Sequence, residues 1–138
     1  SKKMSKSELS DLSRINLTDD KDTMVNKIKK AKTDSLPLPS DIKELDKRPE
    51  AKNLLGIYSS LTNSSLDKTV KIFQGKNFSV FKEDLSQALV EKVHPISEEI
   101  KKLISDKEFL DKILLDGHKK ANDISSKKIK KMHEIIGF

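Results

Sequence analysis

Cysteine is absent from the 138-residue chain, which excludes disulfide bonds, thiolate zinc sites, iron–sulfur clusters and cysteine nucleophiles. Histidine is scarce: none of the three, His94, His118 and His133, lies four residues from another, so we predict no metal site. Apolar runs are only a few residues long, which argues against a transmembrane helix, and the Lys- and Ser-rich start lacks the apolar stretch of a secretory signal. We therefore expect a cytoplasmic protein with no membrane partner.

Charged residues, by contrast, are abundant. The 28 lysines and arginines exceed the 22 acidic residues and give a net charge of +6, which suits a polyanionic partner without requiring one. Only Arg14 and Arg48 are arginines. Because lysine offers phosphates a point charge rather than a two-pronged contact to a base, any nucleic-acid contact should favour the backbone.

Apolar residues recur at helical spacing in five segments with capping residues at their ends, a pattern that disordered chains do not show. The predicted helices cover about 20–32, 49–62, 66–73, 78–104 and 107–136, with residues 35–47 as a proline-containing connector. Pro95 should kink or break the fourth helix. No stretch alternates as a strand does, so we predict an all-α fold, a helical bundle behind a non-helical front.

The helical spacing also predicts where the large side chains lie. Tyr58 and the five phenylalanines fall mostly on apolar stripes, so we predict core packing rather than base stacking. An apolar stripe runs along the last helix as well, with Gly117 and Ala121 four residues apart. That pair indicates either a close crossing with a neighbouring helix or a mild interruption of the helix.

The sequence Lys3-Met4-Ser5-Lys6-Ser7 reads KMSKS. Two ammonium groups three residues apart, with hydroxyl groups beside them, can hold a triphosphate and follow its charge onto a departing pyrophosphate. The plain alternative is a chance match in a chain rich in Lys and Ser.

KMSKS is the second signature of class I aminoacyl-tRNA synthetases, and the later segments resemble the C-terminal part of bacterial tryptophanyl-tRNA synthetases. The similar segments, in order, are INLTDD at 15–20, KIKKAKTDS at 27–35, LDKRPEAKNLLGIYSSLT at 45–62, FQGKNFSVFKEDL at 73–85 and HPI at 94–96. Tyrosyl-tRNA synthetases share the loop but are less similar in the segment from Arg48 to Tyr58. The resemblance covers essentially the whole chain.

The resemblance implies that the KMSKS loop binds ATP, which arrives with Mg²⁺, and stabilises the transition state of amino-acid activation. Lys3 and Lys6 would contact the phosphates as catalytic residues, Ser5 and Ser7 would support them by hydrogen bonds, and Met4 would shape the adenine side.

The resemblance also implies a division of the chain and a larger parent protein. Residues 1–35 would carry the loop and the end of the catalytic domain, and residues 36–138 a helical tRNA-binding domain. Many relatives have Asp-Pro where this chain has Glu8-Leu9, which puts the resting conformation of the loop in question. The nucleotide-binding sheet, its HIGH signature and the tryptophan pocket do not occur here, and the chain starts with Ser1. We therefore expect part of a homodimeric enzyme that is inactive alone.

The last helix carries a run of lysines that point away from its apolar stripe. A solvated helix face is one interpretation, and a surface for the tRNA backbone is the other, favoured by the resemblance. The predicted tRNA contacts are Lys127, Lys128, Lys130 and Lys131. For the chain as a whole, the alternatives are a stand-alone basic helical RNA-binding or interaction module without catalysis, and a fragment of another class I synthetase.

Overall fold

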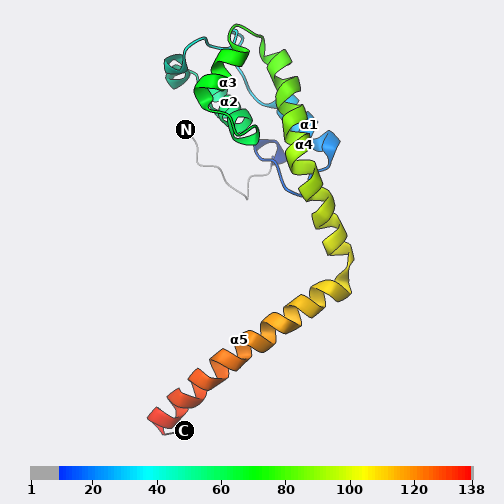
Figure 1. Ribbon diagram of the computed structural model, residues 1–138, viewed down its shortest axis with the longest axis vertical. Coiled ribbons are helices and arrows are strands. Elements are labelled where there is room, and N and C mark those ends of the chain that lie inside the picture. Colours follow the sequence, from blue (N-terminus) through cyan, green and yellow to red (C-terminus); the bar gives the residue numbers. More distant parts are fainter. Residues whose placement is uncertain (1–9, 138) are drawn as a thin grey trace. The chain divides into compact units, whose positions relative to one another are not determined.

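The structure is a computed structural model that describes residues 10–137 (Figure 1). The KMSKS residues therefore lie outside the described part of the chain, as does Phe138. Between residues 10 and 137 every regular element is a helix and no strand occurs, which confirms the all-α prediction. The 3-10 helices are η1 (Asp11–Ser13) and η2 (Ile42–Lys47), and the α-helices are α1 (Lys21–Lys30), α2 (Pro49–Leu61), α3 (Leu66–Phe73), α4 (Phe78–Ser105) and α5 (Lys107–Ile136).

The helices begin and end where the sequence supplies capping chemistry. The Asp20 side chain accepts a hydrogen bond from the backbone N–H of Thr23 at 2.7 Å and so caps α1. Pro49 occupies the first turn of α2, where its missing N–H costs nothing. Ser65 caps α3 through its side chain, and Gly137 ends α5 with a left-handed φ of 81°.

The structure adds a short helix to the connector and decides part of the expectation at Pro95. The connector between α1 and α2 contains η2, because Asp41 and Glu44 form a reciprocal capping box that starts a helical turn. Pro95 lies inside α4 and does not break it, so the expected break is wrong and a kink stays a prediction. The turn beyond Pro95 is held by tertiary packing, since the buried Ser97 hydroxyl donates to the Asp19 carbonyl at 2.8 Å. That contact offsets the intrahelical hydrogen bond that proline cannot make.

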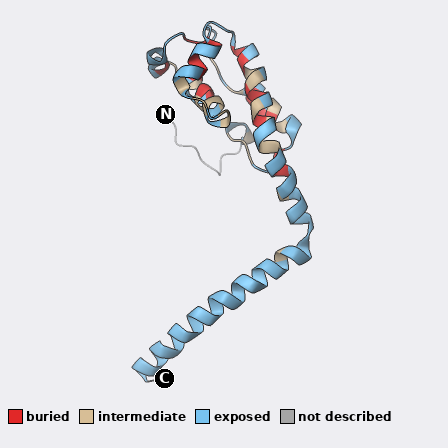
Figure 2. Cartoon of the chain, in the orientation of Figure 1, coloured by how far each residue is buried: buried red, intermediate tan, exposed pale blue. Residues whose placement is uncertain are grey.

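The chain divides into two units, residues 1–98 and 99–138, and the buried apolar side chains of the described residues all lie in the first (Figure 2). Residues on both sides of the domain boundary predicted after residue 35 share this core, and that boundary stays a prediction. At its centre, Tyr58, Phe73 and Phe81 pack together, with ring centroids 4.9 Å apart for the first pair and 4.8 Å for Phe73 and Phe81. The core consists of Met24, Ile28, Leu38, Leu45, Ala51, Leu54, Leu55, Val70, Phe73, Phe78, Phe81, Leu85 and Leu89.

Helix α5 has no buried residue. Its apolar stripe is open to solvent, with Ile124 70% and Ile135 74% exposed. The helix continues past Gly117, so the interruption does not occur there, and the close crossing stays a prediction. Phe109 is 45% exposed, which corrects its assignment to the core, because a helical stripe shows which face is apolar but not whether anything covers it.

The contrast between buried and exposed apolar side chains is measurable. Leu55→Ala, which empties a fully buried site, should lower the free energy of unfolding by about 2–5 kcal/mol. Ile72→Ala, at a position of α3 that is 45% exposed, is the control and should cost about 1 kcal/mol or less. Urea unfolding followed by circular dichroism measures both. Equal losses in the two variants would contradict this assignment of the core.

Candidate functional site

The segment that follows the KMSKS residues is fixed to α1 by a cluster of charged and polar side chains. Its centre is Lys27, whose side chain is only 4% exposed. The Lys27 ammonium donates to Asp11 Oδ2 at 2.5 Å and to Asp19 Oδ2 at 2.7 Å. One buried cation thus joins two carboxylates from opposite ends of the segment 11–19. We call Asp11, Asn16, Asp19 and Lys27 the anchor cluster.

Asn16 completes the anchor cluster from inside the same segment. Its backbone N–H donates to Asp19 Oδ2 at 2.9 Å, and its side-chain amide donates to both carboxylate oxygens of Asp11 at 3.1 Å. The Asp19 N–H returns a bond to the Asn16 carbonyl at 3.0 Å. The guanidinium of Arg14 also pairs with Asp11, at 2.9 Å. The segment is therefore held by bonds along its length rather than at one point.

The charges in and beside the anchor cluster balance: Lys27 and Arg14 supply two cations, and Asp11 and Asp19 supply two anions. The hydrogen bond from Lys27 is the main cause that lowers the pKa of Asp11, and Asn16 adds to it. Burial disfavours the charged form of Lys27, yet the bonds to Asp11 and Asp19 outweigh burial and raise its pKa. Both shifts favour the ionised forms of Asp11 and Lys27.

A second polar junction, at Arg48, orders the connector before α2. The Arg48 guanidinium makes a two-pronged contact with Asp34, with Nε 2.9 Å from Oδ2 and Nη2 2.6 Å from Oδ1. Nη1 also donates to the Pro37 carbonyl at 2.6 Å, and the guanidinium lies 5.8 Å from the centroid of the Phe78 ring. Arg48 thus joins the connector to the start of α2 and reaches the first turn of α4.

The lysines predicted to contact tRNA all lie on α5 and are exposed. Lys127 and Lys128 are followed one turn on by Lys130 and Lys131, and no ion pair with another residue of 10–137 neutralises these four. Their exposure fits both interpretations, a solvated face and a phosphate-binding surface. The tRNA contact therefore stays a prediction.

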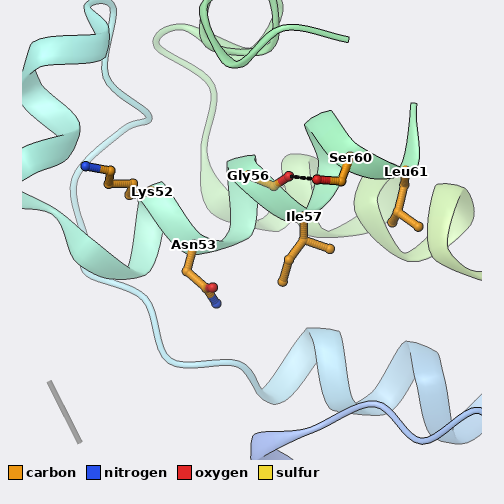
Figure 3. Close-up of a pocket in the computed structure, with 6 residues that line it drawn as sticks. All are labelled: Lys52, Asn53, Gly56, Ile57, Ser60 and Leu61. Carbon is orange, nitrogen blue, oxygen red and sulfur yellow. Dashed lines mark hydrogen bonds between the residues drawn. The ribbon is translucent and has the colours of Figure 1, made fainter. Parts of the chain in front are cut away.

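The described surface has hollows on α2 and beside the anchor cluster. Figure 3 shows one of about 460 Å³, lined by residues of α2 alone, in which Ser60 Oγ donates to the Gly56 carbonyl at 3.0 Å. A second, of about 450 Å³, borders the anchor cluster and has mainly apolar walls. No group of three possible metal ligands occurs in the described residues. Nor, among the helices at 10–137, does any combine the length and apolarity of a membrane span.

Comparison with known proteins assigns the chain to a family. The family model described as tRNA synthetases class I (W and Y) matches residues 1–101, a range that includes both KMSKS and the anchor cluster. The chain belongs to this family. The resemblance drawn from KMSKS and the segments after it is thereby confirmed.

Several similar relatives carry the name tryptophan–tRNA ligase. That of Mesorhizobium japonicum is 49% identical over 138 residues, that of Rickettsia felis 48% over 137 and that of Brucella melitensis 44% over 137. These matches cover 100%, 99% and 99% of this chain but only 39%, 41% and 39% of the relatives. The chain thus spans about two-fifths of the length of the curated relatives it matches.

Sequence reasoning missed the anchor cluster. Lys27 is one of three lysines in the last turn of α1, where the helix dipole favours any cation, so its residue type alone does not mark it out. The signal that could have found it is the spacing: Lys27 lies three residues after Met24 and four before Ala31, on the apolar side of α1.

The lowered pKa of Asp11 predicts a pH dependence of stability. A carboxyl group whose folded pKa lies below its unfolded value of 3.8 stabilises the fold above pH 3.8, and this contribution disappears as the pH falls through the folded pKa. Asp11→Asn should therefore be less stable than the wild type at pH 7 by an amount that shrinks below pH 3.8. Urea unfolding at a series of pH values measures the difference.

The control is Asp116→Asn, which removes a carboxylate exposed on α5. It should change the free energy of unfolding at pH 7 by less than about 0.5 kcal/mol. A difference between wild type and Asp11→Asn that persists unchanged into the acid range would contradict the ionic account.

Proposed function

We propose that this chain is the C-terminal part of a bacterial tryptophan–tRNA ligase. The observation that carries the proposal is the 49% identity to such a ligase along all 138 residues, with an intact KMSKS sequence near the start. The whole protein would join tryptophan to ATP as tryptophanyl-adenylate and then transfer tryptophan to its tRNA. A stand-alone RNA-binding module would have no use for a pyrophosphate-binding motif.

In this proposal the KMSKS lysines act on the phosphates of ATP. The tryptophan carboxylate attacks the α-phosphorus, the bond from that phosphorus to the bridging oxygen breaks, and pyrophosphate leaves with added negative charge. The ammonium groups of Lys3 and Lys6 stabilise that charge as it develops, while Ser5 and Ser7 donate hydrogen bonds and Met4 lines the adenine side. Mg²⁺ arrives on the ATP phosphates as part of the substrate.

The helices after the motif contribute the tRNA-binding part, and the exposed lysines of α5 are its phosphate contacts. Lysine suits this task because each ammonium group neutralises one phosphate without reading a base. The enzyme would work as a homodimer in the cytoplasm, as the family resemblance implies.

The first test concerns catalysis. In the ligase that contains this chain, Lys3→Met or Lys6→Met should lower kcat for tryptophan-dependent ATP–pyrophosphate exchange by about 100-fold or more. Each substitution removes a positive charge that stabilises the negative charge developing on pyrophosphate. Lys2→Met, one position away, is the matched control and should retain the rate. The 138-residue chain alone should show only background exchange. Exchange by the isolated chain, or full activity of both motif variants, would refute the proposal.

The second test concerns the nucleic-acid surface. Replacing Lys127, Lys128, Lys130 and Lys131 together by Gln should weaken tRNA binding and make log K less steep against log salt, because fewer counterions are released. A variant with Lys43, Lys47, Lys68 and Lys71 replaced by Gln loses the same charge from exposed positions elsewhere and is the control. Filter binding at several salt concentrations measures both. An unchanged slope in the α5 variant would show that its lysines form a solvated face.

A further inference from the structure

We propose that the anchor cluster positions the KMSKS segment for the step with ATP, and that Lys27 is its central positioning residue. The inference rests on the proposed function. Lys27 touches neither substrate nor phosphate in this account, and it acts by fixing the chain to which the motif is attached.

The first support is the short chain distance from the motif to the cluster. Asp11 lies four residues after Ser7, so even a fully extended chain keeps the two within about 14 Å. Asp11 is bonded at 2.5 Å to a lysine sixteen residues on, in α1. The cluster therefore fixes the point from which the motif segment extends.

The second support is the way the cluster is built. Its lysine is 4% exposed, and a buried ion pair contributes little to stability compared with apolar packing of the same volume. What such a pair does provide is a defined geometry. The Lys27 ammonium donates to Asp11 and Asp19 at once, and Asn16 donates to both carboxylates. The segment thus has one arrangement that satisfies all of these groups.

The third support is that the cluster is tied to a second helix. Ser97 in α4 is fully buried, and its hydroxyl donates to the Asp19 carbonyl at 2.8 Å. Asp19 consequently accepts from α1 through its side chain and from α4 through its backbone. The segment cannot shift with one helix while the other stays in place.

The loss of Lys27 has a specific expected consequence. Without its ammonium, Asp19 loses its cation and Asp11 keeps only Arg14, so two carboxylates repel each other across the segment. A shift of the segment would displace Lys3 and Lys6, and misplacement by about 1 Å can cost on the order of 100-fold in rate. The residues that would bind tryptophan are not in this chain by the proposal above, so the KM for tryptophan should stay unchanged.

The experiment uses the full ligase that contains this chain and follows ATP–pyrophosphate exchange. Lys27→Met should lower kcat at least tenfold, with less than a twofold change in the KM for tryptophan. Lys30→Met, three residues further along α1 and exposed, is the matched control and should match the wild type. Lys27→Arg, which restores a cation, should recover at least part of the lost rate.

A second variant keeps the test decisive if the first one unfolds. If Lys27→Met does not fold, Asp11→Asn decides, because Asp11 is 46% exposed and its loss leaves the pair of Lys27 and Asp19 intact. It should lower kcat threefold or more at an unchanged KM for tryptophan. Normal kcat in a folded Lys27 or Asp11 variant, or equal changes in kcat and in the KM for tryptophan, would overturn the inference. Absence of exchange in the wild-type enzyme would instead refute the proposed function.

Discussion

The buried ammonium group of Lys27 holds the segment 11–19 against α1. Lys27 donates to Asp11 and Asp19 at once, and because the buried Asp19 carboxylate needs a donor or a cation, the segment 11–19 lies against α1. Asn16 and Ser97 add hydrogen bonds to Asp19, and the bond from Ser97 extends the contacts to α4. The segment 11–19 is ordered mainly by ion pairs and hydrogen bonds, whereas the helices behind it are ordered by apolar burial.

The two units of the chain differ in what holds them together. In residues 1–98 the aromatic side chains of α2, α3 and α4 interlock around Phe73 and Phe81, and the capping groups satisfy the helix ends. Helix α5 is a single helix whose apolar and basic faces are both exposed. Its order within this chain rests on local terms, namely the Asp106 cap and the Gly137 end.

Sequence reasoning succeeded where the signal is local and failed where it depends on tertiary contacts. Helix positions and caps follow from spacing and from single residues such as Asp20 and Pro49, and the family follows from KMSKS and the segments after it. The burial of Lys27 did not follow, because a lysine near the end of a helix is equally well explained by solvent and the helix dipole. The exposure of α5 did not follow either, since a periodic stripe carries no information about its partner. The roles of the motif residues and of the α5 lysines remain predictions.

The packing of Tyr58 gives the protein an intrinsic optical reporter. The chain has one tyrosine and no tryptophan, and that tyrosine lies edge-on to Phe73 and 6.0 Å from the Phe81 ring, centroid to centroid. Its phenol fluorescence therefore originates where three helices meet, with no contribution from α5. Because the chain has no tryptophan, the indole emission of an added ligand would not overlap with indole emission from the protein itself.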